Sequence, residues 1–163
     1  MAVLNRHIIQ TNSEGIPCLY LADSELTTFH EVRARKFDHV TVGKFTNLEP
    51  LRIVDLTEID SITPFAFEDI DITWFAVNIG IIKRIAAEIA KPMRSFDKLI
   101  DYIPTQYIAD YVKSQGYDGI KFASTIHEGG VNYAFFDSKK FKCTSKNLQE
   151  IKELGYKYNR VTL

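Results

Sequence analysis

The chain has 163 residues, of which 45% are hydrophobic and 25% charged, as expected for one globular domain with a sizeable core. A formal net charge of −1 and a pI near 6.4 argue against a nucleic-acid-binding protein, which would carry a basic stripe. The two cysteines, Cys18 and Cys143, are too few for a disulfide framework or a zinc site, so the expected compartment is a reducing cytoplasm.

The first clear element is the stretch 19–33, LYLADSELTTFHEVR, which predicts a short strand, a capped turn and a helix. Asp23 or Ser24 can cap the helix, because either side-chain oxygen accepts from unpaired backbone N–H groups. Glu31 then lies beside an apolar face, where a carboxylate requires a partner, a ligand or water. The simplest partner is Arg35, four residues further on. The apolar residues at near-helical spacing are expected to face the core: Leu26, Phe29 and Val32.

The middle of the chain predicts two strands, a connecting segment and the longest helix. Alternating residues favour strands at 40–45 and 51–56, and turn residues favour a loop or a short helix at 60–67. Apolar residues follow helical spacing over 72–90, until Pro92 ends the helix. Four polar or charged residues interrupt this stretch, so it predicts a buried helix and no membrane span.

The last third predicts a second helix and further short strands. Pro104 suits a helix start, and Gly116 is placed to end that helix in the left-handed conformation. Two strands are expected at 120–123 and 132–136, joined by a loop with paired glycines, and a further strand at 141–143. The tail, 144–163, has features of both helix and strand. Together these elements predict a single α+β domain over 1–163, with helices packed on a curved sheet.

Common ligand and cofactor motifs are absent from the sequence. The four histidines lack metal-ligand partners at helical spacing, and neither GxxxxGK[ST] nor GxGxxG occurs, so no metal, NTPase or Rossmann site is expected. Ser124 does not lie in a GxSxG elbow, which gives little support to a Ser-His-Asp hydrolase. The pair Gly129-Gly130 can bring N–H groups to an anion, although a hairpin connection is the simpler interpretation.

Three polar residues stand inside or at the ends of apolar strands. Tyr20 lies within CLYLA, Ser124 ends GIKFAS and Asn132 is near the start of VNYAFF. Each has an ordinary structural explanation as a tyrosine with a satisfied hydroxyl or as a turn residue. Together with Glu31, however, they would line one site at an edge of the sheet.

Four stretches carry a resemblance to a known family: GIPCLYLADSELTTFHEVR (15–33), LRIVDLT (51–57), YIPTQYIADYVKSQGYDGIKFAS (102–124) and GGVNYAFFD (129–137). Their order, with eight residues between LYLA and Glu31 and seven between Ser124 and Asn132, resembles the RES domain. This is a bacterial toxin family with an ADP-ribosyltransferase-like fold that destroys NAD. The resemblance implies that Glu31 and Ser124 are catalytic and that Tyr20 and Asn132 contact the substrate.

The resemblance departs from the family at its arginines. Gln10 stands where the family has an arginine before the G-x-P turn, and Arg6 lies four residues upstream. The family's early strand, with a second arginine, is expected to precede the first residue of this chain. A neutral amide cannot make the bidentate contact of a guanidinium with a pyrophosphate. Losing one such contact costs roughly 2–4 kcal/mol in binding or rate. Gln10 and Arg6 are therefore substrate-binding candidates, and activity depends on how they compensate.

The implied substrate is NAD, cleaved at the nicotinamide–ribose bond without a metal and with phosphate or water as acceptor. Glu31 would stabilise the positive charge that develops on the ribose, and Ser124 would position the ribose or the nicotinamide. Tyr20 would pack on the ribose and Asn132 would brace a loop or a hydroxyl. The implied partner is an antitoxin of a helix-turn-helix type, a homodimer is also allowed, and no nucleic acid or membrane is expected. Two alternatives stay open: a protein ADP-ribosyltransferase, and a degenerate, inactive RES domain that acts as a binding module.

Overall fold

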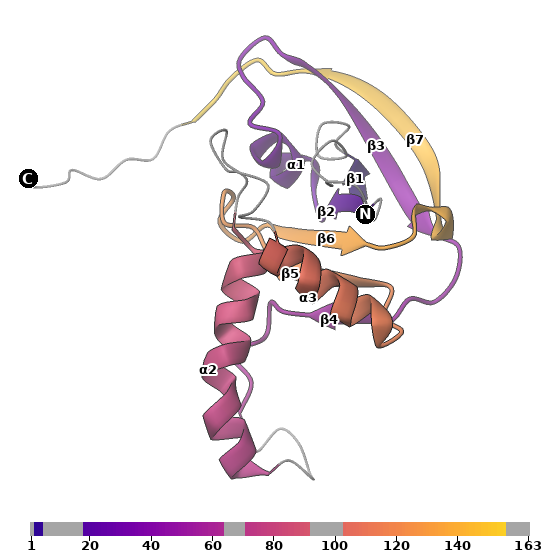
Figure 1. Cartoon of the computed structure of the whole chain (residues 1–163). Coiled ribbons are helices and arrows are strands. Elements are labelled where there is room, and N and C mark those ends of the chain that lie inside the picture. Colours follow the sequence, from indigo (N-terminus) through magenta and orange to yellow (C-terminus); the bar gives the residue numbers. More distant parts are fainter. Residues whose placement is uncertain (1, 5–17, 64–70, 92–102, 156–163) are drawn as a thin grey trace, which may run out of the picture.

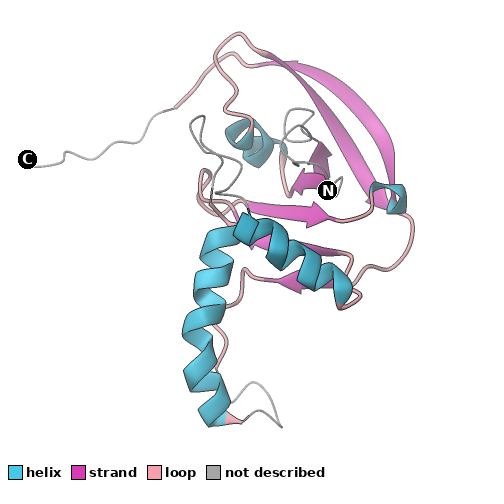
Figure 2. Cartoon of the chain, in the orientation of Figure 1, coloured by secondary structure: helices cyan, strands magenta, loops and turns pink. Residues whose placement is uncertain are grey.

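The computed structural model describes residues 2–4, 18–63, 71–91 and 103–155. In these residues seven strands form one sheet with the order β4-β5-β6-β2-β1-β3-β7, and the strands β3 and β7 arch over one end of it (Figure 1). All strand pairs are antiparallel except β4 with β5, which is parallel. The expected α+β fold with a curved, mostly antiparallel sheet and packed helices is confirmed (Figure 2).

The strands are β1 (Ala2–Leu4), β2 (Leu19–Ala22), β3 (His39–Asn47), β4 (Ile53–Asp55), β5 (Gly119–Ala123), β6 (Val131–Phe135) and β7 (Phe141–Glu150). Among the described residues the helices are α1 (Glu25–Glu31), α2 (Ile72–Ile89) and α3 (Ile103–Ser114), and the 3₁₀ turn η4 (Ser138–Lys140) precedes β7. The helix α1 contacts β1 and β2, whereas α3 contacts β5 and α2.

A hydrophobic core lies on one face of the central strands. Leu19 and Leu21 of β2 pack with Phe135 of β6, and each of the three is at most 6% exposed. Partly buried residues from several strands and loops pack against them: Phe45, Leu51, Ile53, Tyr133 and Phe141.

The opposite face of the same strands carries polar residues. In the β2–β6 register Tyr20 is paired with Ala134, and Ala22 is paired with Asn132. Because side chains alternate between the two faces of a strand, these four side chains share the face that lies away from Leu19 and Leu21. Tyr20 and Asn132 thus occupy neighbouring diagonal positions.

The helix α1 begins as predicted but buries a different side. Ser24 is its N-cap, and the Ser24 hydroxyl accepts from the Thr27 N–H at 3.1 Å. Thr27 and Thr28 are fully buried, whereas Leu26 is 55% exposed and Phe29 only partly buried. The expected apolar core face is therefore wrong for Leu26, whereas Phe29 and Val32 are partly buried. The most deeply buried side of α1 instead carries Thr27 and Thr28, whose hydroxyls donate to Asp23 and to the Ser24 carbonyl.

The helix expected over 72–90 is present as α2, but the prediction that it is buried is wrong. It projects away from the sheet (Figures 1 and 2), and of its residues only Phe75 is buried. The side chains of Trp74, Val77 and Ile81, which share the predicted apolar side, are 52–69% exposed. No helix in the described ranges is long and apolar enough to cross a membrane.

Several other boundaries differ from the sequence-based expectation. The strand expected at 40–45 extends over β3, and the one expected at 51–56 shrinks to β4. The strand expected at 141–143 continues as β7 to Glu150, so the start of the tail, which had features of both helix and strand, is a strand. The strand β1 was not expected at all. Gly116 has a φ of +78°, which confirms the left-handed end of α3. In the segment 60–67 the described residues form a turn, and residues 64–67 lie outside the described ranges.

Candidate active site

Glu31, the last residue of α1, receives hydrogen bonds from two other elements. Its Oε1 accepts from Ser124 Oγ at 2.7 Å and from Asn132 Nδ2 at 2.6 Å, so the structure brings these three predicted residues together. The expected pairing with Arg35 is wrong, because α1 ends at Glu31 and the Arg35 backbone N–H donates to Asp38. No ion pair joins Glu31 to any lysine or arginine in the described ranges.

A hairpin positions Ser124 and Asn132. Ser124 follows β5 directly and Asn132 is the second residue of β6, and the Ser124 N–H donates to the Gly130 carbonyl at 2.8 Å across the loop 124–130. The Gly130 N–H donates to the His127 carbonyl at 3.0 Å. The hairpin interpretation of Gly129-Gly130 is therefore confirmed, and the Gly130 N–H is not available to an anion because it already donates to His127.

The hydroxyl of Ser124 has all its hydrogen-bonding capacity in use. It donates to Glu31 and accepts from the backbone N–H groups of Ile126 at 3.2 Å and His127 at 2.9 Å. A serine hydroxyl offers one donor and two acceptor lone pairs, so nothing remains. Ser124 therefore orients the carboxylate and is not the activated nucleophile of a Ser-His-Asp hydrolase, in which the proton would go to an imidazole.

Asn132 is 9% exposed, and its amide fixes Glu31 from the sheet side. With Oε1 held twice, Oε2 of Glu31 has no hydrogen-bond partner among the residues that the structure describes. When one carboxylate oxygen is fixed, the other can accept a hydrogen bond from a hydroxyl, or face a developing cation, without reorganising.

Tyr20 lies on the same sheet face as Asn132 but makes no hydrogen bond to Glu31, Ser124 or Asn132. Burial raises the pKa of its phenol to about 12, and the neighbouring Cys18 adds to the shift. Its hydroxyl is therefore neutral at physiological pH, and the residue offers an uncharged ring on the sheet face that carries Asn132.

Two predicted site residues cannot be placed, because Gln10 and Arg6 lie outside the described ranges. In those ranges no group of three or more His, Cys, Asp or Glu side chains is arranged to hold a metal ion.

A polar network that the sequence did not predict lies at Thr27, one helical turn before Glu31. Thr27 Oγ1 donates to Asp23 Oδ1 at 2.7 Å and lies 2.8 Å from Ser24 Oγ and 2.9 Å from His127 Nδ1. The rings of His127 and His30 stack with centroids 4.7 Å apart. The helical spacing of Asp23, Ser24 and Thr27 could have predicted the contacts among these three residues. Nothing in the sequence connects them to a histidine one hundred positions after Thr27.

The fold and site define an α+β domain in which a helix-end carboxylate is held by a hydroxyl and an amide from the two ends of a β-hairpin. The family model of the RES domain matches residues 10–157, so the chain belongs to the RES domain family, which is associated with enzymes that act on NAD. No significant match was found among curated proteins or solved structures.

Proposed function

We propose that this protein is an NAD-degrading toxin that cleaves the nicotinamide–ribose bond with phosphate or water as acceptor. The observation that carries the proposal is the Glu31 carboxylate, whose Oε1 is fixed by Ser124 and Asn132 while Oε2 has no described partner. Membership in the RES domain family supports NAD as the substrate class.

The chemistry needs a fixed anion more than an acid. When the bond breaks, its electron pair neutralises the pyridinium nitrogen, so nicotinamide leaves uncharged and without protonation. Positive charge develops on the ribose, as it does in the oxocarbenium-like transition states of glycoside hydrolysis. Oε2 of Glu31 accepts from a ribose hydroxyl and stabilises this charge in a geometry that is already set.

The reaction is completed when either water or phosphate attacks the ribose. Attack by water forms the new C–O bond, releases one proton and yields ADP-ribose. Attack by phosphate forms a C–O–P linkage and yields a phosphorylated ADP-ribose. The ring of Tyr20, uncharged at neutral pH, packs on the ribose from the sheet side.

The proposal is tested by following nicotinamide release from NAD, with and without phosphate. Glu31→Gln keeps the shape of the side chain and removes its charge, so we expect the rate to fall about 10²–10³-fold. Glu25→Gln is the matched control, because Glu25 lies on the same helix but contacts Gln149 instead of the hairpin. An unchanged rate in Glu31→Gln contradicts the proposed role.

Product analysis in the same assay separates the alternatives. Free ADP-ribose identifies water as the acceptor, and its phosphorylated form identifies phosphate. Transfer of label from NAD to protein favours an ADP-ribosyltransferase, whereas the absence of nicotinamide release favours an inactive binding module. An antitoxin of a helix-turn-helix type belongs to the proposal through the family resemblance alone, and co-purification with the product of a neighbouring gene tests it.

A further inference from the structure

The loop 124–130 contacts two residues on one side of α1. Thr27 and Glu31 are four positions apart and so lie above one another on the helix surface. Ser124, at one end of the loop, holds Glu31, and His127, in its middle, contacts Thr27 at 2.9 Å. The same loop therefore fixes the carboxylate and is itself anchored one helical turn away.

The hydrogen bonds around Thr27 assign the proton on His127. An ionised Asp23 carboxylate can only accept, so the single hydroxyl proton of Thr27 goes to Asp23. Thr27 Oγ1 then has only its two lone pairs left. Ser24 Oγ and His127 Nδ1 must therefore both donate to it. Neutral His127 is the tautomer with its proton on Nδ1.

Packing holds this imidazole in place. The ring of His30 stacks on His127 with an angle of 5° between the ring planes. A Cβ added at Gly130 would lie 2.7 Å from His127 Nδ1 and 2.8 Å from the Thr27 side chain, so only glycine permits this approach. The backbone N–H of the same His127 donates to Ser124 Oγ.

We infer that His127 is a positioning residue of the Glu31 site. Its Nδ1–H anchors the loop to Thr27, and its backbone N–H then fixes the Ser124 hydroxyl that orients the carboxylate. The kinetic consequences of this inference rest on the proposed function, but the hydrogen bonds of His127 with Thr27 and Ser124 do not.

The kinetic test compares replacements that keep or remove the donor. His127→Ala is expected to lower kcat for nicotinamide release about tenfold and to change KM less than about threefold, because a loosened Glu31 affects mainly the charged transition state. His127→Asn retains an N–H donor at the position of Nδ1 and should restore most of the rate, whereas His127→Gln, whose donor lies further out, should not. Thr27→Val removes the acceptor and should resemble His127→Ala. His39→Ala, at an exposed histidine of β3, is the control.

A second measurement needs no activity. Imidazole ¹⁵N NMR should show neutral His127 protonated on Nδ1. The amide protons of Ile126 and His127 should exchange about tenfold faster in Thr27→Val than in the wild type. A proton on Nε2, or unchanged exchange, overturns the inference. So does a failure of His127→Asn to restore the rate when the wild-type spectrum shows the proton on Nδ1. A wild-type protein that releases no nicotinamide defeats the proposed function, and the NMR result still decides the inference.

Discussion

At the scale of single residues, the phenol of Tyr20 links the site to alkaline stability. Its pKa is about 12 in the folded protein and about 10 when exposed, so between these values the unfolded state loses the proton first. The stability that this group contributes is fully present below pH 10 and is lost as the pH rises toward 12. We expect the wild type to lose about 1 kcal/mol more free energy of unfolding than Tyr20→Phe between pH 9 and pH 11. Urea unfolding at both pH values measures this difference, and equal losses would contradict the burial of the phenol.

The residue scale also shows what the sequence could predict about the site. Ser124 and Asn132 could be identified as candidate site residues because each is a polar residue at the end of an apolar strand. Glu31 could be identified because a carboxylate beside an apolar helix face needs a partner, which Ser124 and Asn132 supply. The contact between Thr27 and His127 was not predictable, because it depends on the conformation of the loop 124–130. Periodicity describes strands and helices and carries no information on how a loop folds back.

At the scale of elements, replacing two glycines by alanine is expected to change the stability of the protein in opposite directions. A Cβ at Gly119 of β5 would lie 2.5 Å from the Ala134 carbonyl oxygen of the neighbouring strand, so Gly119→Ala should destabilise the protein by about 1–3 kcal/mol. At Gly80 of α2 an added Cβ would meet no described residue within 4 Å outside the backbone of its own helix, and Gly80→Ala should stabilise the protein by about 0.5–1 kcal/mol through helix propensity. Thermal unfolding of both variants checks the signs. A stabilised Gly119→Ala would mean that β5 and β6 are not this close.

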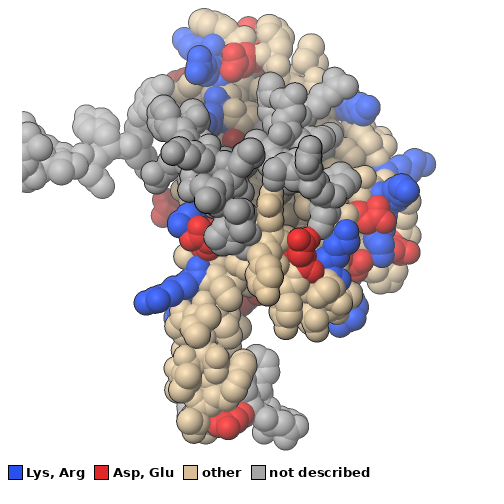
Figure 3. All heavy atoms as spheres, in the orientation of Figure 1, with Lys and Arg blue, Asp and Glu red and all other residues tan. Residues whose placement is uncertain are grey.

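The helix α2 illustrates the limit of element prediction. Its residue spacing identified the helix, and Pro92 indicated its end, because the helix stops at Ile89. The N-cap, Asp71, is known only from the structure. The same spacing could not show what the apolar side packs against, since that depends on where the sheet lies. Figure 3 shows the projecting part of α2 as a surface with few charged residues. The strand β1 was not predicted for a related reason. Its three residues are too few to show alternation, and its position in the sheet is set by pairing with β2 and β3.

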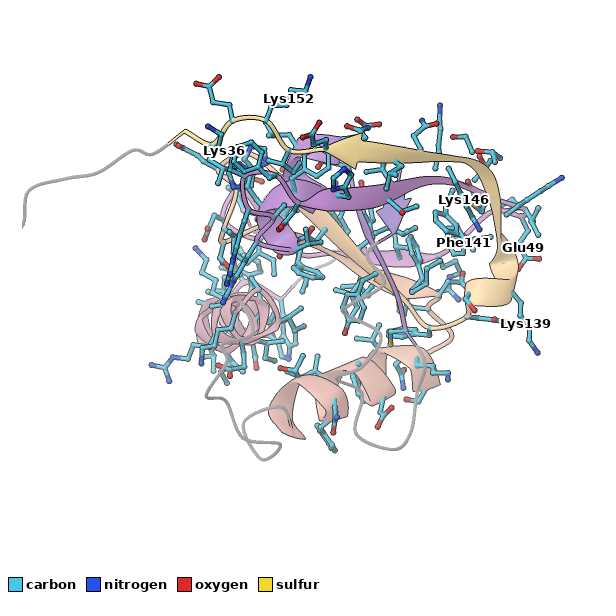
Figure 4. The ribbon with its side chains drawn as sticks, turned by 90° about the horizontal axis from the view of Figure 1, so that it is seen from above. Lys36, Glu49, Lys139, Phe141, Lys146 and Lys152 are labelled. Carbon is cyan, nitrogen blue, oxygen red and sulfur yellow. The ribbon has the colours of Figure 1, made fainter. Side chains whose placement is uncertain are left out.

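At the scale of the whole molecule, charged residues gather at the end of the sheet where η4 leads into β7. Figure 4 shows Glu49, Lys139 and Phe141 together at this end, whereas Lys36 and Lys152 lie at the other end of the β3–β7 pair. Lys140 of η4 forms ion pairs with Glu49 and with Asp118 at 2.9 Å. These contacts connect the arching strands to the edge of the sheet that carries β4 and β5.

Asp118 is the residue through which this connection passes. Its Oδ2 accepts from the Arg52 backbone N–H at 2.7 Å, its own N–H donates to the Arg52 carbonyl at 2.7 Å, and its carbonyl accepts from the Phe136 N–H at 2.9 Å. It thus ties together the segments next to β4, β5 and β6, while its other carboxylate oxygen pairs with Lys140. The hydrogen bond from Arg52, followed by the contact with Lys140, lowers the pKa of Asp118 below its ordinary value.

A lowered carboxyl pKa makes the stability of the molecule depend on acid. Because folded Asp118 holds a proton less tightly than the unfolded chain, its contribution is present above the ordinary value of 3.8 and is lost as the pH falls through the lower folded pKa. Asp118→Asn keeps an oxygen that can accept from Arg52 but removes the charge. We expect the wild type to be more stable than this variant at pH 7 and the difference to shrink steadily between pH 5 and pH 2. Urea unfolding over this range measures it, with Asp110→Asn on the exposed side of α3 as the control. A difference that stays constant with pH would show that the charge of Asp118 does not stabilise the junction of β4, β5 and β6.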